Sequence, residues 1–334
     1  MANYLVAGAA GFIGSRVSEL LMEDGHGVVG IDNLNDAYDV RMKHWRLERL
    51  QRQGTEMGGQ FAFYPVELAD RQAVATGGFE LGGKAVNFEG IINLAARAGV
   101  RPSVENPWVY VDTNVTGTLN LLEYAQAHAV PKFILASTSS IYGPNAVLPT
   151  PEESDSDHPL QPYAATKKGA EALCHAYHAM YGIDITIFRY FTVYGPAGRP
   201  DMSLFRFTQW IREGRPLRLN GDGEQTRGFT YVDDIARGTI LGLKRLGDEV
   251  INLGGHETIS MNGVIQMLEE LIGRKAQIMR LPANPADMLA NWANVEKARR
   301  LLGWEPRVGL RAGMTNLVNW YETERSWASQ IKTD

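Results

Sequence analysis

A glycine-rich turn, GAAGFIG at residues 8–14, lies between an apolar strand pattern at 4–7 and a helical pattern at 12–23. Its glycines, three residues apart, let the backbone approach a pyrophosphate closely, and the following helix directs free N–H groups at the phosphates. Such a turn can also serve tight packing alone. Asp32, however, stands 18 residues after Gly14 at the end of the next apolar run, where a carboxylate binds the adenosine ribose. The sequence therefore predicts a dinucleotide-binding site.

The acidic residue also distinguishes between the two nicotinamide dinucleotides. A carboxylate at Asp32 repels the 2′-phosphate of NADP, and Asn33-Leu34 supplies no arginine beside it. Arg16 lies in the first expected helix, and we assign it to the surface. NAD is therefore the expected cofactor.

Apolar runs and helical patterns alternate through the first two-thirds of the chain. The expected strands are 4–7, 28–31, 61–64, 91–94, 132–136, 185–189 and 251–253, and the expected helices are 12–23, 40–51, 109–127, 163–180, 260–272 and 294–302. Strands that alternate with helices are typical of a parallel sheet covered on both faces. We therefore predict an α/β fold built on a Rossmann-type, doubly wound parallel sheet.

The pattern loosens in the last third of the chain, which indicates a second, smaller domain. We predict a Rossmann domain that binds NAD over residues 1–190, to which the chain returns at about 229–256. Residues 191–228 and 257–334 are expected to form a mixed α/β C-terminal domain that binds the substrate. The glycine-rich stretch 77–90 is interpreted as a surface loop.

Composition argues against several classes of partner. A formal net charge of −5 over 334 residues gives no basic footprint for nucleic acid. No secretory signal or membrane span is visible and the single cysteine cannot form an internal disulfide, so we expect a cytoplasmic protein with no membrane partner. Cys174 lies in an apolar helical pattern, typical of a buried, inert thiol. His175 and His178 lack a third ligand, so no metal is expected, and the charged stretch 41–52 is interpreted as a solvated helix.

A tyrosine and a lysine four residues apart open the expected helix at 163–180. Tyr163 and Lys167 would lie on one helix face, one turn apart, as they also would on a surface helix without any function. The hydroxyl cluster at 137–140, however, follows an expected strand, and ligands of open parallel sheets bind beyond the carboxyl ends of strands. A lysine ammonium and a positively charged nicotinamide would both favour the phenolate. The combination predicts that Tyr163, assisted by Thr138, removes a proton from an alcohol while NAD takes the hydride.

These motifs resemble those of the extended short-chain dehydrogenase/reductase family, and the similarity to its nucleotide-sugar epimerase/dehydratase branch runs nearly end to end. The resemblance implies Thr138, Tyr163 and Lys167 as catalytic residues. It implies NAD as the cofactor, bound by Gly8, Gly11, Phe12, Ile13, Gly14, Asp32, Asn33, Leu68, Leu94, Ala95, Ala96, Tyr163, Lys167 and Tyr190. The implied ligands of a UDP-sugar substrate are Arg101, Ser139, Ser140, Thr192, Arg199, Arg227 and Asp287, with Arg227 on the phosphates and Asp287 on the nucleoside.

The residues beside Thr138 indicate the reaction within this branch. Dehydratases of the branch typically have Thr-Asp-Glu at this place, whereas two serines follow Thr138 here and supply no acid for an elimination. Segments 30–50, 95–117 and 190–207 are similar to the UDP-glucuronate 4-epimerase subgroup. The resemblance therefore implies oxidation and re-reduction at C4, which converts UDP-glucuronate to UDP-galacturonate. The chain departs from the subgroup at Ala197, commonly Trp, and at Arg97, frequently Gln, and both changes are expected to alter the pocket.

Alternatives of three kinds stay open. In the first alternative, the substrate is the neutral pair UDP-glucose and UDP-galactose. In the second, the enzyme decarboxylates UDP-glucuronate through the same 4-keto acid. From a different class, the chain is an NAD-sensing protein without catalysis, although the presence of Thr138, Tyr163 and Lys167 argues against it.

The sugar carboxylate is expected to be held by hydroxyls and one arginine. Ser139, Ser140 and Thr192 supply the hydroxyls, and the fork of Arg199 suits two carboxylate oxygens. Arg199 equally suits backbone carbonyls or the nucleotide phosphates. The family often dimerises through helices such as 109–127 and 163–180, so a homodimer is expected as well.

Overall fold

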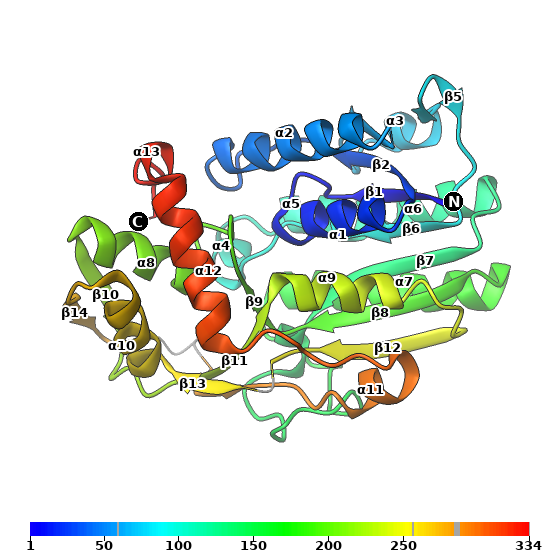
Figure 1. Cartoon of the computed structure of the whole chain (residues 1–334). Helices are drawn as coiled ribbons and strands as arrows, with labels where there is room; N and C mark the ends of the chain where they lie inside the picture. Colours follow the sequence, from blue (N-terminus) through cyan, green and yellow to red (C-terminus); the bar gives the residue numbers. More distant parts are fainter. Residues whose placement is uncertain (59, 256, 284–287, 334) are drawn as a thin grey trace.

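A parallel sheet of 7 strands forms the centre of the molecule (Figure 1). In this computed structural model, which describes residues 1–58, 60–255, 257–283 and 288–333, the strand order is 12-8-7-6-1-2-3. These strands are β1 (Asn3–Ala7), β2 (Gly27–Asp32), β3 (Phe61–Pro65), β6 (Gly90–Asn93), β7 (Lys132–Thr138), β8 (Asp184–Tyr190) and β12 (Asp248–Leu253). Every neighbouring pair runs parallel, so the predicted Rossmann-type sheet is confirmed.

The strand order reverses beside β1. β2 and β3 lie on one side of β1, whereas β6, β7, β8 and β12 follow on the other. In open parallel sheets, ligands bind beyond the carboxyl ends of the strands at such a reversal. The glycine turn directly follows β1, and the segment 94–96 directly follows β6. Two of the predicted cofactor segments therefore meet at this point.

Helices cover both faces of the sheet. They are α1 (Phe12–Glu23), α2 (Arg41–Glu56), α3 (Arg71–Ala75), α6 (Gly117–Ala127), α7 (Pro162–Tyr181), α9 (Val232–Leu241) and α11 (Glu296–Leu302). Because successive strand side chains point to opposite faces, Val6 belongs to the apolar core that includes residues of α1, α2, α9 and α11. Leu5 belongs to the core that includes residues of α3, α6 and α7. Cys174 lies in the second of these cores, buried as predicted.

The expected long helix at 109–127 consists of three segments. They are α5 (Trp108–Tyr110), the π-helical η1 (Val111–Thr116) and α6. Within η1, the amide of the buried Asn114 donates to the Arg97 carbonyl at 3.0 Å and to the Thr166 hydroxyl at 3.1 Å, and its oxygen accepts from the Arg97 N–H at 2.9 Å. The π-helical turn thus contains a side chain, Asn114, that holds the loop following β6 in place. The stretch 77–90, predicted as a loop, contains a short hairpin of β4 (Glu80–Leu81) and β5 (Lys84–Ala85).

Past β8 the chain builds a smaller mixed α/β region with its own apolar core. Its elements are β9 (Thr192–Tyr194), α8 (Ser203–Glu213), β10 (Pro216–Asn220), β11 (Thr226–Tyr231), β13 (Thr258–Ser260), α10 (Met261–Ile272), β14 (Gln277–Leu281), β15 (Ala290–Asn291), α12 (Leu310–Thr323) and α13 (Arg325–Ala328). β11 pairs parallel with β9 and β15 and antiparallel with β13. Trp210, Leu268 and Leu317 are among the buried side chains of this core. The predicted fold class is confirmed, and the exact division of the chain between two domains stays a prediction.

Candidate active site

A cleft of about 680 Å³ opens at the carboxyl edge of the central sheet. A volume of this size is typical of sites for cofactors and small molecules. The predicted residues that line it are Gly8, Gly11, Phe12, Ile13, Gly14, Asp32, Asn33, Leu68, Leu94, Ala95, Ala96, Thr138, Ser139, Ser140, Tyr163, Lys167, Tyr190, Thr192 and Arg199. The fold thus gathers the predicted catalytic and cofactor residues with four of the predicted substrate residues.

The glycine turn has a backbone that larger residues cannot adopt. Gly8 has a φ of 78°, and a Cβ there would lie 2.7 Å from the Ala95 nitrogen. A Cβ on Gly14 would lie 2.1 Å from the Gly8 oxygen. The described structure shows no side chain capping the start of α1, so its first N–H groups stay available to an anion. This cradle fits the diphosphate of a dinucleotide.

The ribose end of the cleft contains a buried charge pair. Asp32, 8% exposed, accepts a hydrogen bond from the Leu34 N–H at 2.8 Å and one from Lys43 Nζ at 3.3 Å. Lys43 is 5% exposed and lies on α2, which the sequence predicted to be a solvated helix. For this face of α2 that prediction is wrong, because Lys43 and Arg46 point into the protein. Sequence reasoning missed Lys43 because the fold of the loop 33–40 and the packing of α2, not adjacency in the sequence, bring it to Asp32.

The catalytic tyrosine predicted from the sequence stands at the first turn of α7. Burial raises the pKa of Tyr163, while a hydrogen bond with Thr138 and the positive charge of Arg199 act to lower it. Burial also lowers the pKa of Lys167 to about 8, and the negative charge of Glu171 opposes this shift. Arg199 is thus a cation near the Tyr163 phenol that the sequence pattern did not predict.

A buried polar network adjoins Tyr163 and Lys167, the predicted catalytic pair. Glu171, one turn beyond Lys167, accepts hydrogen bonds from Arg189 Nε at 3.0 Å, Arg189 Nη2 at 2.8 Å and the Ser137 hydroxyl at 2.5 Å. Arg189 also donates to the Tyr142 hydroxyl at 3.0 Å. The network ties α7 to β7 and β8, and the sequence offered the i, i+4 spacing of Lys167 and Glu171 as its one visible sign.

Hydroxyl groups line the sugar side of the cleft. The Thr138 hydroxyl donates to Ser140 Oγ at 3.2 Å, and Asn291 Nδ2 donates to Ser139 Oγ at 3.2 Å. Asn291 lies on β15 and lines the cleft, and the sequence reasoning missed it because its position depends on pairing between β15 and β11.

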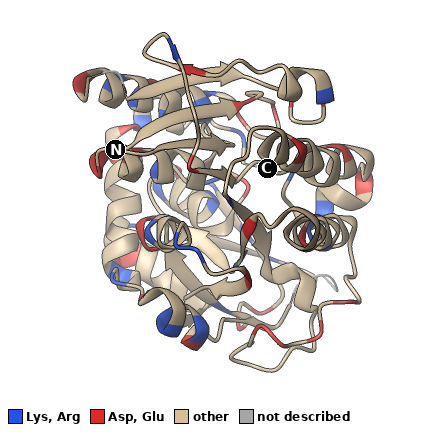
Figure 2. Ribbon diagram, turned by 90° about the vertical axis from the view of Figure 1, so that its right-hand side faces the viewer, with Lys and Arg blue, Asp and Glu red and all other residues tan. Residues whose placement is uncertain are grey.

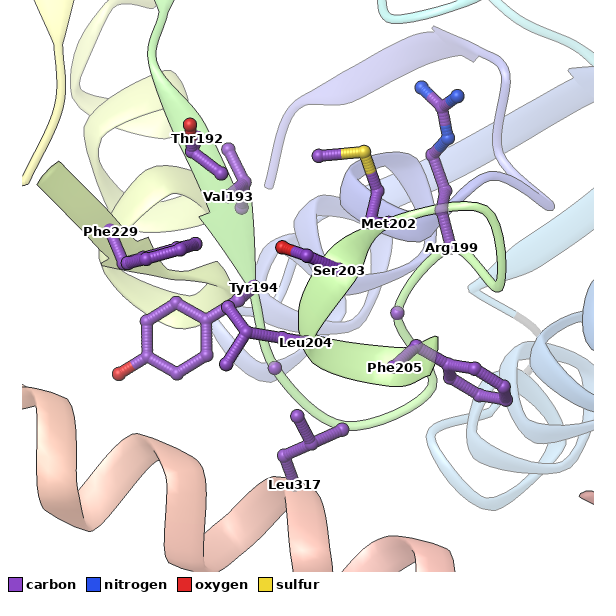
Figure 3. A pocket seen from close by; sticks show the side chains of 12 residues that line it. Thr192, Val193, Tyr194, Arg199, Met202, Ser203, Leu204, Phe205, Phe229 and Leu317 are labelled. Atoms are coloured by element: carbon purple, nitrogen blue, oxygen red, sulfur yellow. The ribbon is translucent and has the colours of Figure 1, made fainter. Parts of the chain in front are cut away.

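Arg199 forms a two-point ion pair, with Nε and Nη2 lying 3.0 and 2.5 Å from the Asp201 carboxylate. A small hollow of about 10 Å³ adjoins the cleft and shares Thr192, Arg199 and Met202 with it (Figure 3). In that view the Arg199 side chain extends away from Leu317. Such a hollow has room for about one water molecule.

Other predicted substrate residues are not brought to the cleft. Arg101 is exposed on α4 (Val100–Glu105) and does not line it. Arg227 donates to the carbonyls of Thr226 at 2.8 Å and Met288 at 2.6 Å and is likewise absent from the lining. Asp287 lies outside the described residues. The roles assigned to these residues stay predictions.

Within the described ranges, no group of three or more His, Cys, Asp or Glu side chains is placed to hold a metal ion, and His175 Nδ1 instead contacts Asp248 at 2.5 Å. Basic and acidic residues lie interspersed in the view of Figure 2. Over the same described residues, every helix is too short or too polar to cross a bilayer.

The extent of the match to known proteins identifies the family. The NAD dependent epimerase/dehydratase family matches residues 4–254 of the chain. The chain belongs to this family. It is 53% identical over 333 residues to a UDP-glucuronate 4-epimerase of Thermodesulfobacterium geofontis, covering 99% of this chain and 100% of the relative.

Solved structures of this family share the whole architecture. A UDP-glucuronic acid 4-epimerase from Bacillus cereus, in complex with UDP-glucuronic acid and NAD, has a TM-score of 0.85 at 36% identity, covering 96% of this chain and 99% of that one. A UDP-glucose 4-epimerase from Thermotoga maritima, with UDP-glucose, has a TM-score of 0.86 at 32% identity, covering 97% and 99%.

Proposed function

We propose that the protein is an NAD-dependent 4-epimerase that interconverts UDP-glucuronate and UDP-galacturonate. The observation that carries the proposal is the lining beside Tyr163, where Ser139 and Ser140 stand at the places of the acidic pair that elimination requires. The 53% identical relative is named for this reaction. The fold alone does not select the sugar, because the TM-scores for the UDP-glucuronic acid and UDP-glucose epimerases are 0.85 and 0.86.

In the proposed reaction, Tyr163 takes the proton of the C4 hydroxyl, and the Thr138 hydroxyl stabilises the phenolic oxygen. Bound NAD⁺ accepts the C4 hydride, and NADH later returns it to the opposite face, so no cofactor is consumed. Between the two transfers the 4-keto sugar turns about its diphosphate. Tyr163 then returns its proton to the C4 oxygen, which becomes the new C4 hydroxyl. The glycine turn and the start of α1 hold the cofactor diphosphate throughout.

The proposed intermediate is a β-keto acid, which loses CO₂ when its carboxylate can align with the ketone. An epimerase must therefore hold the carboxylate away from that geometry. We assign this task to Ser139, Ser140, Thr192 and Arg199, which line one cleft with Tyr163. A guanidinium fork can bind two carboxylate oxygens at once.

A second candidate is a 4-epimerase for neutral UDP-sugars. It is favoured by the ion pair of Arg199 with Asp201, in which the Nε–Nη2 edge of the guanidinium is already engaged. A sugar carboxylate has to compete with Asp201 for that edge, whereas a neutral sugar does not.

Incubation of purified protein with UDP-glucuronate, followed by chromatographic separation of the products, tests the proposal. We expect UDP-galacturonate, and none from Tyr163→Phe, which keeps the ring but loses the titrating oxygen. Retention of NAD by this variant serves as the control for folding. UDP-xylose with CO₂ would identify a decarboxylase, turnover of UDP-glucose alone would favour the second candidate, and no turnover of any UDP-sugar would refute the enzyme assignment.

We propose further that the protein acts in the cytoplasm as a homodimer. The dimer proposal is supported by α7 and η1, which pack side by side; a Cβ on Gly169 of α7 would lie 3.7 Å from Val115 of η1. Together they present the exposed side chains of Ala165, Ala172 and Val111 to the solvent. Helices with small exposed side chains can approach a second copy closely.

A further inference from the structure

Arg46, on α2, is a buried cation behind the cleft, with 2% of its surface exposed. Its guanidinium donates two hydrogen bonds to the Ala197 carbonyl, from Nε at 3.2 Å and from Nη2 at 2.6 Å. Nη1 donates to the Ala10 carbonyl at 3.1 Å and to the Tyr38 hydroxyl at 2.7 Å. Arg46 therefore joins the glycine turn to a turn that lies 151 positions beyond Arg46 itself, and uses all three guanidinium nitrogens to do so.

The distant turn, residues 195–199, has a backbone that requires support. Ala197 has a φ of 52°, in the left-handed region that residues other than glycine rarely adopt. A Cβ built on Gly198 would lie 3.7 Å from the Phe12 ring, so the turn also packs against the start of α1. Strained conformations persist where the surroundings fix them. The paired hydrogen bonds from Arg46 to the Ala197 carbonyl supply such a restraint.

The same turn carries Arg199 into the cleft. Arg199 lines the cleft together with Tyr163, and its charge acts on the Tyr163 phenol. The carbonyl that Arg46 holds is two residues before Arg199, within the one turn. We propose that Arg46 is a positioning residue, which locks the 195–199 turn against the glycine turn and so sets where Arg199 stands relative to Tyr163. This inference rests on the proposed epimerase function.

The shape of the guanidinium, and not its charge alone, is what this role requires. A lysine carries the same charge on a compact head and cannot span the carbonyls of Ala10 and Ala197 as a planar fork does. Misplacement of a catalytic group by about 1 Å can cost on the order of 100-fold in rate. Arg46→Lys is therefore expected to lower kcat by on the order of 10- to 100-fold.

A local measurement separates positioning from general damage. Hydrogen–deuterium exchange of the NAD-bound protein, without sugar, should be faster in Arg46→Lys at the amides of 195–202 and unchanged in the central strands. Kinetics with UDP-glucuronate then form a double-mutant cycle. Because Arg46 acts through Arg199, Arg46→Lys should reduce kcat much less in an Arg199→Leu background than in the wild type.

The matched control is Arg49→Lys, on the same helix. Arg49 is surface-facing, pairs with Glu19 at 3.2 Å and lies over the Trp45 ring at 4.9 Å, so its variant should exchange and turn over like the wild type. The proposal would be overturned if the amides of 195–202 exchange at the wild-type rate in Arg46→Lys. It would also be overturned if the fold-loss of kcat in the double variant equals the product of the losses in Arg46→Lys and Arg199→Leu. If Arg46→Lys does not fold, Arg46→Met, which buries no charge, is judged by the same exchange criterion. Since exchange needs no sugar, a failure of the substrate assignment leaves that result intact.

Discussion

The phenol of Tyr163 is subject to opposing influences. Burial raises its pKa, and the positive charge of Arg199 lowers it by favouring the phenolate. If the phenolate is the base, the rate rises with pH as Tyr163 loses its proton. Arg199→Leu removes the cation, so the pKa of Tyr163 should rise further. We expect the rising limb of kcat/KM against pH to move to higher pH in this variant.

Arg199→Lys separates charge from shape in the same experiment. It keeps a cation near Tyr163 and loses the fork, so the rising limb should stay near its wild-type position even if the KM for UDP-glucuronate increases. An unchanged limb in Arg199→Leu would show that Arg199 does not set the ionisation of Tyr163.

At the scale of residues, short sequence patterns were sufficient to predict those parts of the site whose residues are close neighbours in the chain. The glycine turn and the pair of Tyr163 and Lys167 are visible in the sequence because each lies within one short, continuous segment. Lys43 and Arg46 were interpreted as solvated because a helix rich in charge usually faces water, yet both are at most 5% exposed. Their burial depends on carbonyl and carboxylate partners that lie far away in the sequence.

Helix α7 arranges three ionisable side chains at four-residue spacing. Tyr163, Lys167 and Glu171 share one face, and Glu171 is the negative charge that raises the pKa of Lys167 against the effect of burial. Glu171→Gln keeps the shape and loses the charge, so the pKa of Lys167 should fall below about 8. The alkaline limb of kcat/KM, where Lys167 loses its proton, should therefore begin at lower pH.

Ser137→Ala is the control for this change. It removes another hydrogen-bond partner of Glu171 and leaves every charge in place, so the alkaline limb should not move. Glu171→Gln also leaves Arg189 without its carboxylate, and breaking a buried pair on one side costs about 3–5 kcal/mol of stability. A fall in the melting temperature with no shift of the alkaline limb would assign Glu171 to the scaffold alone.

At the scale of elements, prediction succeeded for strands that stand in local alternation with helices. It failed inside 109–127, where the π-helical turn coincides with contacts of Asn114 with Arg97 and Thr166 that depend on the tertiary fold. The short strands β9, β11 and β15 were also missed. Each spans six residues or fewer and is defined by pairing across long stretches of chain.

At the scale of the whole molecule, the cleft lies between a cofactor side and a sugar side, which differ in how far apart their residues are in the sequence. The cofactor side follows the chain order strand, turn, helix, and could be derived from the sequence. The sugar side combines β7, the start of α7, β9 and β15, and β9 and β15 come together because both pair with β11. This explains why a dehydrogenase-type proton site could be derived from the residues themselves, whereas the prediction of the alcohol, C4 of UDP-glucuronate, depended on the resemblance to a known family.

Assembly of two copies is the last property to test. Along α7, Ala165, Gly169, Ala172 and Ala176 lie at i, i+4, i+7 and i+11, a single face with Ala165 and Ala172 exposed. If this face meets its copy across a two-fold axis, Ala172→Arg brings two guanidinium groups into a closely packed contact. Light scattering after size exclusion should give twice the 37.0 kDa chain mass for the wild type and a single chain mass for Ala172→Arg. Gln266→Arg, an exposed change on α10, should leave the mass unchanged. A wild-type monomer would refute the dimer, and a dimeric Ala172→Arg would place its interface on another face.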